Sequence, residues 1–295
     1  MYREVALDPH CLSEFHYYGL LKTAFGFEEG RYVIAPLKEW VREAAQSVKA
    51  SDLPPVKKKS VTNFLNKLQR NKSNPYLLFP NDRTGIANDI EHSDWQKWVA
   101  AQCTYREFST IVSERESEKS IGYSDIIDGH GEWIVPKTTW IDRDDISIVG
   151  AISSLLNLSK ELIIVDQYFR LASNKVLHGI VQEMQQSQQI ERILLVSSVA
   201  TADPIKVFER EFLNRYRYVP SFSYLIAPER YFHDRYMITD RAAVKAGHGF
   251  SVGVIQGTQA DKLSLSICGK EERDETLAHI EGLKAGAEQQ VIILN

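Results

Sequence analysis

Three side chains with complementary chemistry stand between residues 233 and 240 of this 295-residue chain: His233, Arg235 and Asp240. The apolar stretch that holds the first two, YFHDRYMIT, predicts a β-strand, which would send residues 233 and 235 to one face, roughly 6.5 Å apart along it. An imidazole and a guanidinium at that spacing can converge on one small anion, and arginine binds phosphate bidentately. Asp240 is seven positions from His233, so on a straight strand its side chain would point to the opposite face. It approaches His233 only if the chain bends at residues 239–241. We therefore expect His233 to attack or transfer a proton, Arg235 to hold charge and Asp240 to orient the imidazole.

A structural interpretation of the same residues is also open. Buried charges are costly unless they are paired, and ion-pair networks use the same residue types as active sites. In that case Asp234 pairs with a nearby cation, Arg235 pairs with an acid and His233 is an ordinary strand histidine.

The elements that would position these residues follow a regular order from residue 162 onward. Apolar runs in LIIVDQYF, RILLVSS and FSYLIA predict three strands separated by two helices. Ser173 is the predicted N-cap of the first helix, and Asp203 with Pro204 begins the second, which runs to about residue 216. The core face of the first helix is formed by Leu177, Ile180, Val181 and Met184. This order implies a parallel sheet with right-handed crossovers.

The rest of the chain after residue 162 is predicted to contain further strands and residues that could form the wall of a binding site. We predict strands at 231–239, 243–255 and 262–268, a helix at 271–286 and a last strand in VIIL. Asp166 follows the first strand, at the edge where open α/β sheets place ligands, and Tyr168 stands two residues later. Both are candidates for the wall of a binding site, and turn chemistry with a half-buried aromatic is the equally open alternative.

The order His233-x-Arg235-x4-Asp240 resembles the HxK(x)4D signature of the phospholipase D superfamily, with arginine in place of lysine. Two other features agree with it. A strand ending in VDQYF opens this half of the chain, and AGHGF begins six residues after Asp240, where the family usually has GSxN. The resemblance covers residues 155–295, about half of the chain. It implies an α/β fold, an α/β/α sandwich with a mixed sheet.

The resemblance also implies a mechanism. The superfamily includes metal-independent phosphodiesterases, among them phospholipases, nucleases and a restriction-enzyme branch. One histidine forms a covalent phosphohistidine, and a second, from another copy of the motif, protonates the leaving oxygen. Carried over to this chain, His233 is the nucleophile or acid, Arg235 clamps phosphate and Asp240 orients His233, with no metal and no cofactor. Because one copy of the motif is present, a homodimer through this domain would supply the second histidine.

The segment Gly247-His248-Gly249-Phe250 replaces the family's serine and asparagine. We expect His248 to be an additional acid/base group or a phosphate-binding residue in a turn made by the two glycines. The pattern HDR…VKAGHGF also resembles a non-catalytic branch of the family, the C-terminal domain of certain MIT-domain proteins, which binds membranes. A phosphate-binding or scaffolding module without turnover is therefore the alternative to an enzyme.

Residues 1–150 have a less regular pattern and are predicted to form a mainly helical or α+β domain, with a boundary to residues 151–295 between 140 and 155. APLKEWVREAAQSV and DWQKWVAAQCTYREFSTIVSE predict helices. Residues 56–73 contain six basic residues and no acid, and Ser60 is the predicted cap of a helix there. Its apolar face would be Val61, Phe64, Leu65 and Leu68. Its candidate nucleic-acid contacts are Lys57, Lys58, Lys59, Lys67, Arg70 and Lys72, which could equally be solvated cations near a helix end.

Composition limits the remaining possibilities. The net charge of −4 gives no global attraction to nucleic acid, so such a partner would need a local patch. Cys11, Cys103 and Cys268 are widely spaced, which argues against a zinc site and for a reducing, cytoplasmic setting. No apolar run approaches the roughly 20 residues of a membrane-spanning helix.

Three functions follow from these observations. The leading one is a metal-independent nuclease acting on DNA or RNA, of a type suited to bacterial restriction or antiviral defence. The second is a module that binds phosphate-bearing ligands, nucleic acid or anionic lipid, without cleaving them. The third is an assembly subunit that contacts a partner protein through residues 1–150, with a purely structural charge cluster.

Overall fold

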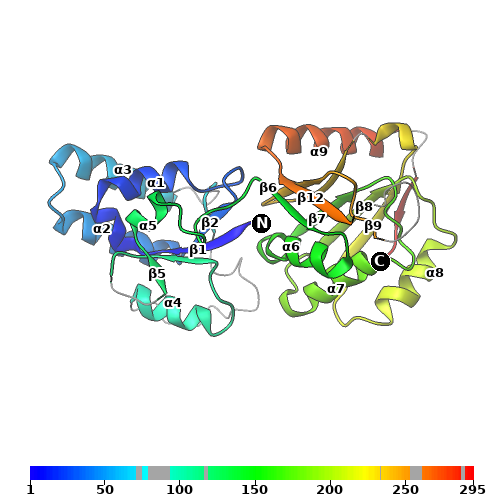
Figure 1. Cartoon of the computed structure of the whole chain (residues 1–295), viewed down its shortest axis with the longest axis horizontal. Coiled ribbons are helices and arrows are strands. Elements are labelled where there is room, and N and C mark those ends of the chain that lie inside the picture. Colours follow the sequence, from blue (N-terminus) through cyan, green and yellow to red (C-terminus); the bar gives the residue numbers. More distant parts are fainter. Residues whose placement is uncertain (71–74, 79–93, 116–118, 233, 253–260, 287–289) are drawn as a thin grey trace. The chain divides into compact units, whose positions relative to one another are not determined.

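The computed structural model describes residues 1–70, 75–78, 94–115, 119–232, 234–252, 261–286 and 290–295. The chain divides into two compact units, one formed by Tyr2–Val135 and the other by Pro136–Asn295 with Met1 (Figure 1). The division at Pro136 precedes the expected range of 140–155. Residues 138–158, expected to straddle the boundary, form a strand and a helix of the second unit.

The N-terminal unit is built on a five-stranded sheet of order β3-β2-β1-β4-β5, and every neighbouring pair in it is parallel. Its strands are β1 (Arg3–Leu7), β2 (Arg31–Ile34), β3 (Leu77–Leu78), β4 (Thr110–Val112) and β5 (Ser120–Ile121). Its helices are η1 (Pro9–Ser13), α1 (Phe15–Thr23), α2 (Leu37–Ala50), α3 (Pro55–Arg70), α4 (Trp95–Cys103) and α5 (Tyr123–Ile127). The unit is rich in helix, as expected, but its all-parallel sheet with intervening helices makes it α/β rather than α+β. Strands of two to five residues are too short to show a periodic pattern in the sequence.

Helix α3 contains the basic segment and begins earlier than expected. Its first residue is Pro55, which lacks an N–H group and therefore suits the first turn, where that group has no helical partner. Ser60, the expected cap, lies inside the helix and donates its hydroxyl to the Val56 carbonyl. The predicted apolar face is confirmed, because all four of its residues are buried: Val61, Phe64, Leu65 and Leu68.

The C-terminal unit is an α/β structure with a mixed eight-stranded sheet of order β13-β9-β8-β7-β10-β11-β12-β6. Its strands are β6 (Thr138–Asp142), β7 (Glu161–Val165), β8 (Arg192–Ser197), β9 (Ser221–Ile226), β10 (Arg235–Thr239), β11 (Ala243–Ala246), β12 (Lys262–Ile267) and β13 (Gln290–Ile293). Its helices are α6 (Asp145–Leu158), α7 (Lys175–Ser187), α8 (Pro204–Phe208), η3 (Glu209–Leu213), η4 (Glu229–Tyr231) and α9 (Lys270–Lys284). Helix α9 lies on one side of this sheet and α6 and α7 lie on the other (Figure 1).

The predicted βαβαβ core is confirmed, since β7, β8 and β9 are parallel neighbours. All four predicted core residues of α7 are fully buried: Leu177, Ile180, Val181 and Met184. The cap differs by one position, because the Asn174 side chain accepts the N–H of Leu177, whereas Ser173 has a positive φ of 53°. Asp203 makes no cap hydrogen bond and pairs instead with Lys206 at 2.8 Å.

The segment around the charged motif is less extended than predicted. Residues 229–231 form the short helix η4, so β10 begins at Arg235. On the other side of the hairpin, β11 ends at Ala246, and Gly247–Phe250 form a turn. The shorter hairpin places a turn, rather than a strand, beside the end of β7.

Candidate functional site

One edge of the eight-stranded sheet gathers most of the site residues that were predicted in the C-terminal unit. Strand β7 ends at Val165, which pairs with Tyr236 of the antiparallel β10, so Asp166 follows directly beside Arg235. Arg235 in turn pairs with Ala246, the last residue of β11, which brings the turn at residues 247–250 to the same edge. Residues from three chain segments therefore meet where open α/β sheets bind ligands.

Asp166 holds this edge together. Its side chain is buried, and its carboxylate accepts the N–H groups of Phe250 at 2.7 Å and Tyr168 at 3.0 Å. Gly249 lies so close that a Cβ added to it would stand 2.6 Å from Asp166 Oδ2, and its φ is +80°. Glycine is thus required at residue 249 by both backbone conformation and space.

The electrostatics of Asp166 reflect two opposing influences. Desolvation by burial raises the pKa of its carboxyl group, while the two backbone N–H groups and the positive charges of Arg235 and Arg143 oppose this rise. The net direction is upward, so burial dominates.

The cationic groups at this edge come from separate segments. The Arg235 guanidinium is half-buried and makes no hydrogen bond or ion pair with any other residue that the structure describes. Arg143, just after β6, donates to the carbonyls of Ser251 at 3.2 Å and His248 at 3.1 Å and so supports the turn. His248 itself is exposed. Two guanidinium groups and an imidazole beside a glycine turn can bind a phosphate or another oxyanion.

Tyr168 forms the neighbouring wall. Its hydroxyl donates to Glu229 Oε1 at 2.7 Å, and its carbonyl accepts the hydroxyl of Ser251 at 3.1 Å. Gly247 is closely packed too, because an added Cβ would stand 2.6 Å from Ser264 Oγ. The sequence analysis missed Arg143 and Glu229. Arg143 sits in DRDD, which has a loop's composition, and only the pairing of β6 with β12 brings it to this edge.

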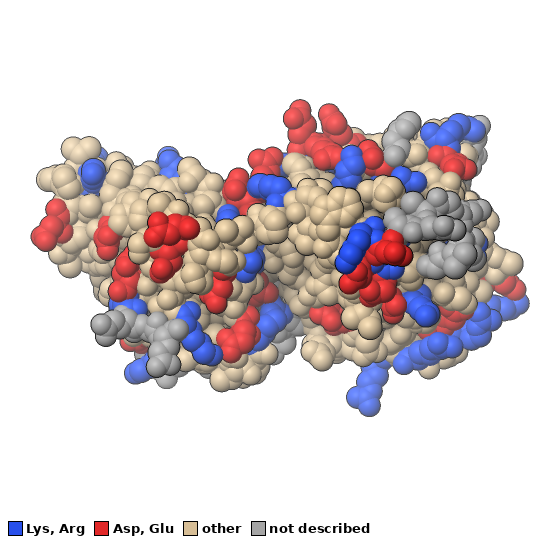
Figure 2. Space-filling view, viewed as in Figure 1, with Lys and Arg blue, Asp and Glu red and all other residues tan. Residues whose placement is uncertain are grey.

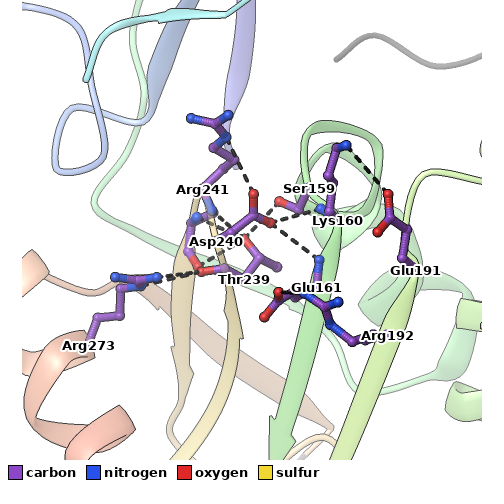
Figure 3. Close-up of polar contacts among 10 residues, drawn as sticks. Ser159, Lys160, Glu161, Glu191, Arg192, Thr239, Asp240, Arg241 and Arg273 are labelled. Atoms are coloured by element: carbon purple, nitrogen blue, oxygen red, sulfur yellow. Dashed lines mark hydrogen bonds and ion pairs between the residues drawn. The ribbon is translucent and has the colours of Figure 1, made fainter. Parts of the chain in front are cut away.

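Asp240 lies at the opposite end of β10 (Figure 3). Its carboxylate accepts the N–H groups of Lys160 at 2.8 Å and Glu161 at 3.3 Å, and it pairs with Arg241 at 3.5 Å. The pairing of β10 with β7 and β11 keeps the strand extended, so Asp240 is roughly 17 Å along the chain from Arg235. The structure therefore does not bring Asp240 to the edge that holds Arg235.

Other predicted residues fall partly outside the described structure. His233 and Lys72 lie outside the described residues. On α3, Lys57 lies over the Phe15 ring at 4.8 Å, and Lys58 donates to the Lys49 carbonyl at 3.0 Å. The remaining predicted contacts are exposed: Lys59, Lys67 and Arg70.

Two searches over the described part of the chain gave negative results. It contains no group of three or more His, Cys, Asp or Glu side chains arranged to hold a metal ion. Among its helices, none combines the length and the apolar character needed to cross a membrane.

Comparison with known proteins gives only a weak structural likeness. No protein-family model and no curated protein matches the chain. Among solved structures, it is similar to TrmBL2, described as an archaeal chromatin protein with a novel mode of DNA binding, with 11% identity and a TM-score of 0.29. The match covers 52% of this chain and 55% of that protein's length. At this TM-score the likeness supports no inference about fold or function.

Proposed function

We propose that this protein is a metal-independent phosphodiesterase of phospholipase D type that cleaves nucleic acid. The observation that supports it is the meeting of Arg235, Arg143, His248 and the Gly249 turn at one sheet edge, fastened by the buried carboxylate of Asp166. Such an edge can hold a phosphodiester and stabilise the charge that develops on its oxygens. The α/β sandwich with a mixed sheet that this superfamily has is part of the same proposal.

The chemistry requires two histidines. His233 attacks phosphorus, a P–N bond forms, and the bond to the leaving oxygen breaks as a second imidazole gives that oxygen a proton. Water then attacks phosphorus, the P–N bond breaks, and the second imidazole takes the proton back. Arg235 and Arg143 bind the non-bridging oxygens.

The second histidine has two candidate sources. It is His233 of a partner copy in a homodimer, or it is His248 of the same chain. His248 is tested because its turn lies at the sheet edge that holds Arg235, directly after Ala246, the partner of Arg235.

Nucleic acid is the proposed substrate because α3 exposes Lys59, Lys67 and Arg70 on the face opposite its buried residues. Cations on one helix face contact successive phosphates of a polynucleotide. A nuclease joined to a separate N-terminal unit would suit bacterial restriction or antiviral defence, with that unit contacting nucleic acid or a partner protein. A reducing, cytoplasmic setting belongs to the same proposal.

The test is cleavage in EDTA of single- and double-stranded DNA and of RNA by the full chain, with variants His233→Ala and His248→Ala. Loss of cleavage in His233→Ala, with an acid-labile phosphoenzyme in wild type, supports the proposal. Absence of cleavage of all substrates, or strict dependence on Mg²⁺, overturns it.

Comparing His233→Ala, His248→Ala and their mixture separates the two sources of the second histidine. If the second histidine is His248 of the same chain, both variants are inactive and their mixture is inactive too. If a partner's His233 is used, His248→Ala remains active and the activity per chain falls on dilution below the dimer's dissociation constant.

A non-catalytic phosphate-binding module is the second candidate. It is favoured by the Gly247–Phe250 turn, which occupies the place of the family's serine and asparagine. In that case wild type binds anionic lipid or nucleic acid without turnover, and Arg235→Ala weakens binding. Arg241→Ala is the matched control, because Arg241 carries the same charge at the other end of β10.

A further inference from the structure

A cavity lies on the face of β10 opposite Arg235 and takes no part in the proposed phosphodiester site. It has a volume of about 220 Å³ and lies between α9 and the ends of β7 and β8. Its walls are apolar: Val165, Val196, Ile280 and Leu283. Tyr236 lines it and Arg235 does not, because consecutive strand residues point to opposite faces.

Aromatic rings surround the cavity near the start of β10. Tyr231 and Phe232 line it from the segment before the strand, and Tyr236 lines it from the strand itself. His279 of α9 completes this set, with Nε2 at 3.1 Å from the Tyr231 carbonyl and ring centroids 6.4 Å apart. Aromatic faces carry negative quadrupole density, so such a lining attracts organic cations.

The ionised groups around the cavity add to this preference. Asp234 and Glu275 line it, and Glu272 stands beside Tyr236, whose hydroxyl donates to it at 2.9 Å. Lys245 pairs with Asp234 at 2.9 Å and Glu272 at 3.3 Å. Two carboxylates thus pair with one ammonium group, while Glu275 lines the cavity separately, and Figure 2 shows acidic side chains over the part of the unit where α9 lies. Excess negative charge disfavours an anionic ligand here.

We propose that this cavity binds an organic ammonium ion with a small apolar body, about the size of one substituted ring. A cavity of about 150 Å³ accommodates benzene in another protein, so 220 Å³ accepts a ring with a short side chain. The apolar body packs against Val165, Val196, Ile280 and Leu283. The ammonium group lies among the aromatic rings and next to Glu275. This site is independent of phosphodiester cleavage.

The experiment compares 2-phenylethylammonium with its neutral analogue 2-phenylethanol and with 3-phenylpropionate, by calorimetry on the full chain. We expect the ammonium ion to bind roughly 3- to 30-fold more tightly than the alcohol, and the carboxylate to bind least. Glu275→Gln should reduce the preference for the cation. Glu271→Gln is the matched control, because it removes the same charge from the same helix at a residue that does not line the cavity.

Several outcomes decide the proposal. Equal affinity of the ammonium ion and the alcohol, or no binding of the ammonium ion at millimolar concentration, overturns it. So does an equal effect of the Glu275 and Glu271 variants. Leu283→Trp, which fills the cavity, should abolish binding, and a circular dichroism spectrum like that of wild type shows that the variant folds. Binding retained in a folded Leu283→Trp variant places the ligand elsewhere and also overturns the proposal.

Discussion

The contact between Gly249 and Asp166 makes a quantitative prediction for Gly249→Ala. A left-handed backbone costs a residue with a Cβ about 1–2 kcal/mol. The new Cβ would also stand 2.6 Å from Asp166 Oδ2 and displace the carboxylate that accepts the Phe250 N–H. A hydrogen bond to a charged group contributes about 1.5–3 kcal/mol. We therefore expect Gly249→Ala to lower the free energy of unfolding of the C-terminal unit by about 2.5–5 kcal/mol.

The assay is amide hydrogen exchange in β8, a central strand of this unit whose protection reports its unfolding. Gly150→Ala in α6 is the control. An added Cβ there meets no atom within 4 Å, so alanine should stabilise the helix by about 0.5–1 kcal/mol.

A double-mutant cycle with Asp166→Ala tests whether the collision with Asp166 causes the destabilisation by Gly249→Ala. In that background, Gly249→Ala should cost only the backbone strain of about 1–2 kcal/mol, because the carboxylate it collides with is absent. The same cost in both backgrounds, or a cost below about 1 kcal/mol in wild type, would refute the reasoning.

Three further predictions follow from single groups. Asp240→Ala should lower the free energy of unfolding by about 1–2 kcal/mol, measured by urea denaturation, because two backbone N–H groups lose their acceptor, and phosphate binding should not change. The folded-state pKa of Asp166 is raised, so its contribution to stability is present at acidic pH and is lost as pH rises through that pKa. The stability of wild type relative to Asp166→Asn should therefore fall as pH rises above 3.8, the usual pKa of an aspartate; a difference independent of pH contradicts this. Burial raises the pKa of the Cys11 and Cys268 thiols to about 12, so at pH 8 iodoacetamide should label Cys103 first, as peptide mass spectrometry can show.

Local patterns in the sequence were sufficient to predict much of the fold of the C-terminal unit. Apolar runs of strand length and the helical spacing of Leu177, Ile180, Val181 and Met184 predicted the βαβαβ core, because each element there buries a face that its own residues determine. The proximity of Asp166, Tyr168 and Gly247–Gly249 also follows from topology. The carboxyl end of a parallel strand and the near end of an adjacent hairpin meet at one edge of the sheet.

The remaining features depend on contacts between distant segments. Arg143 reaches the site edge because β6 pairs with β12, more than a hundred residues later, and no local pattern signals such a pairing. In the N-terminal unit, β1 to β4 likewise become parallel neighbours only by pairing across connections that contain helices. Asp240 is separated from Arg235 because ladders on both sides hold β10 straight. Thus the sequence alone determined which residues can bind an anion, through their chemistry and local spacing. Only the tertiary structure decided which of them meet, because strand pairing sets distances that spacing along the chain does not.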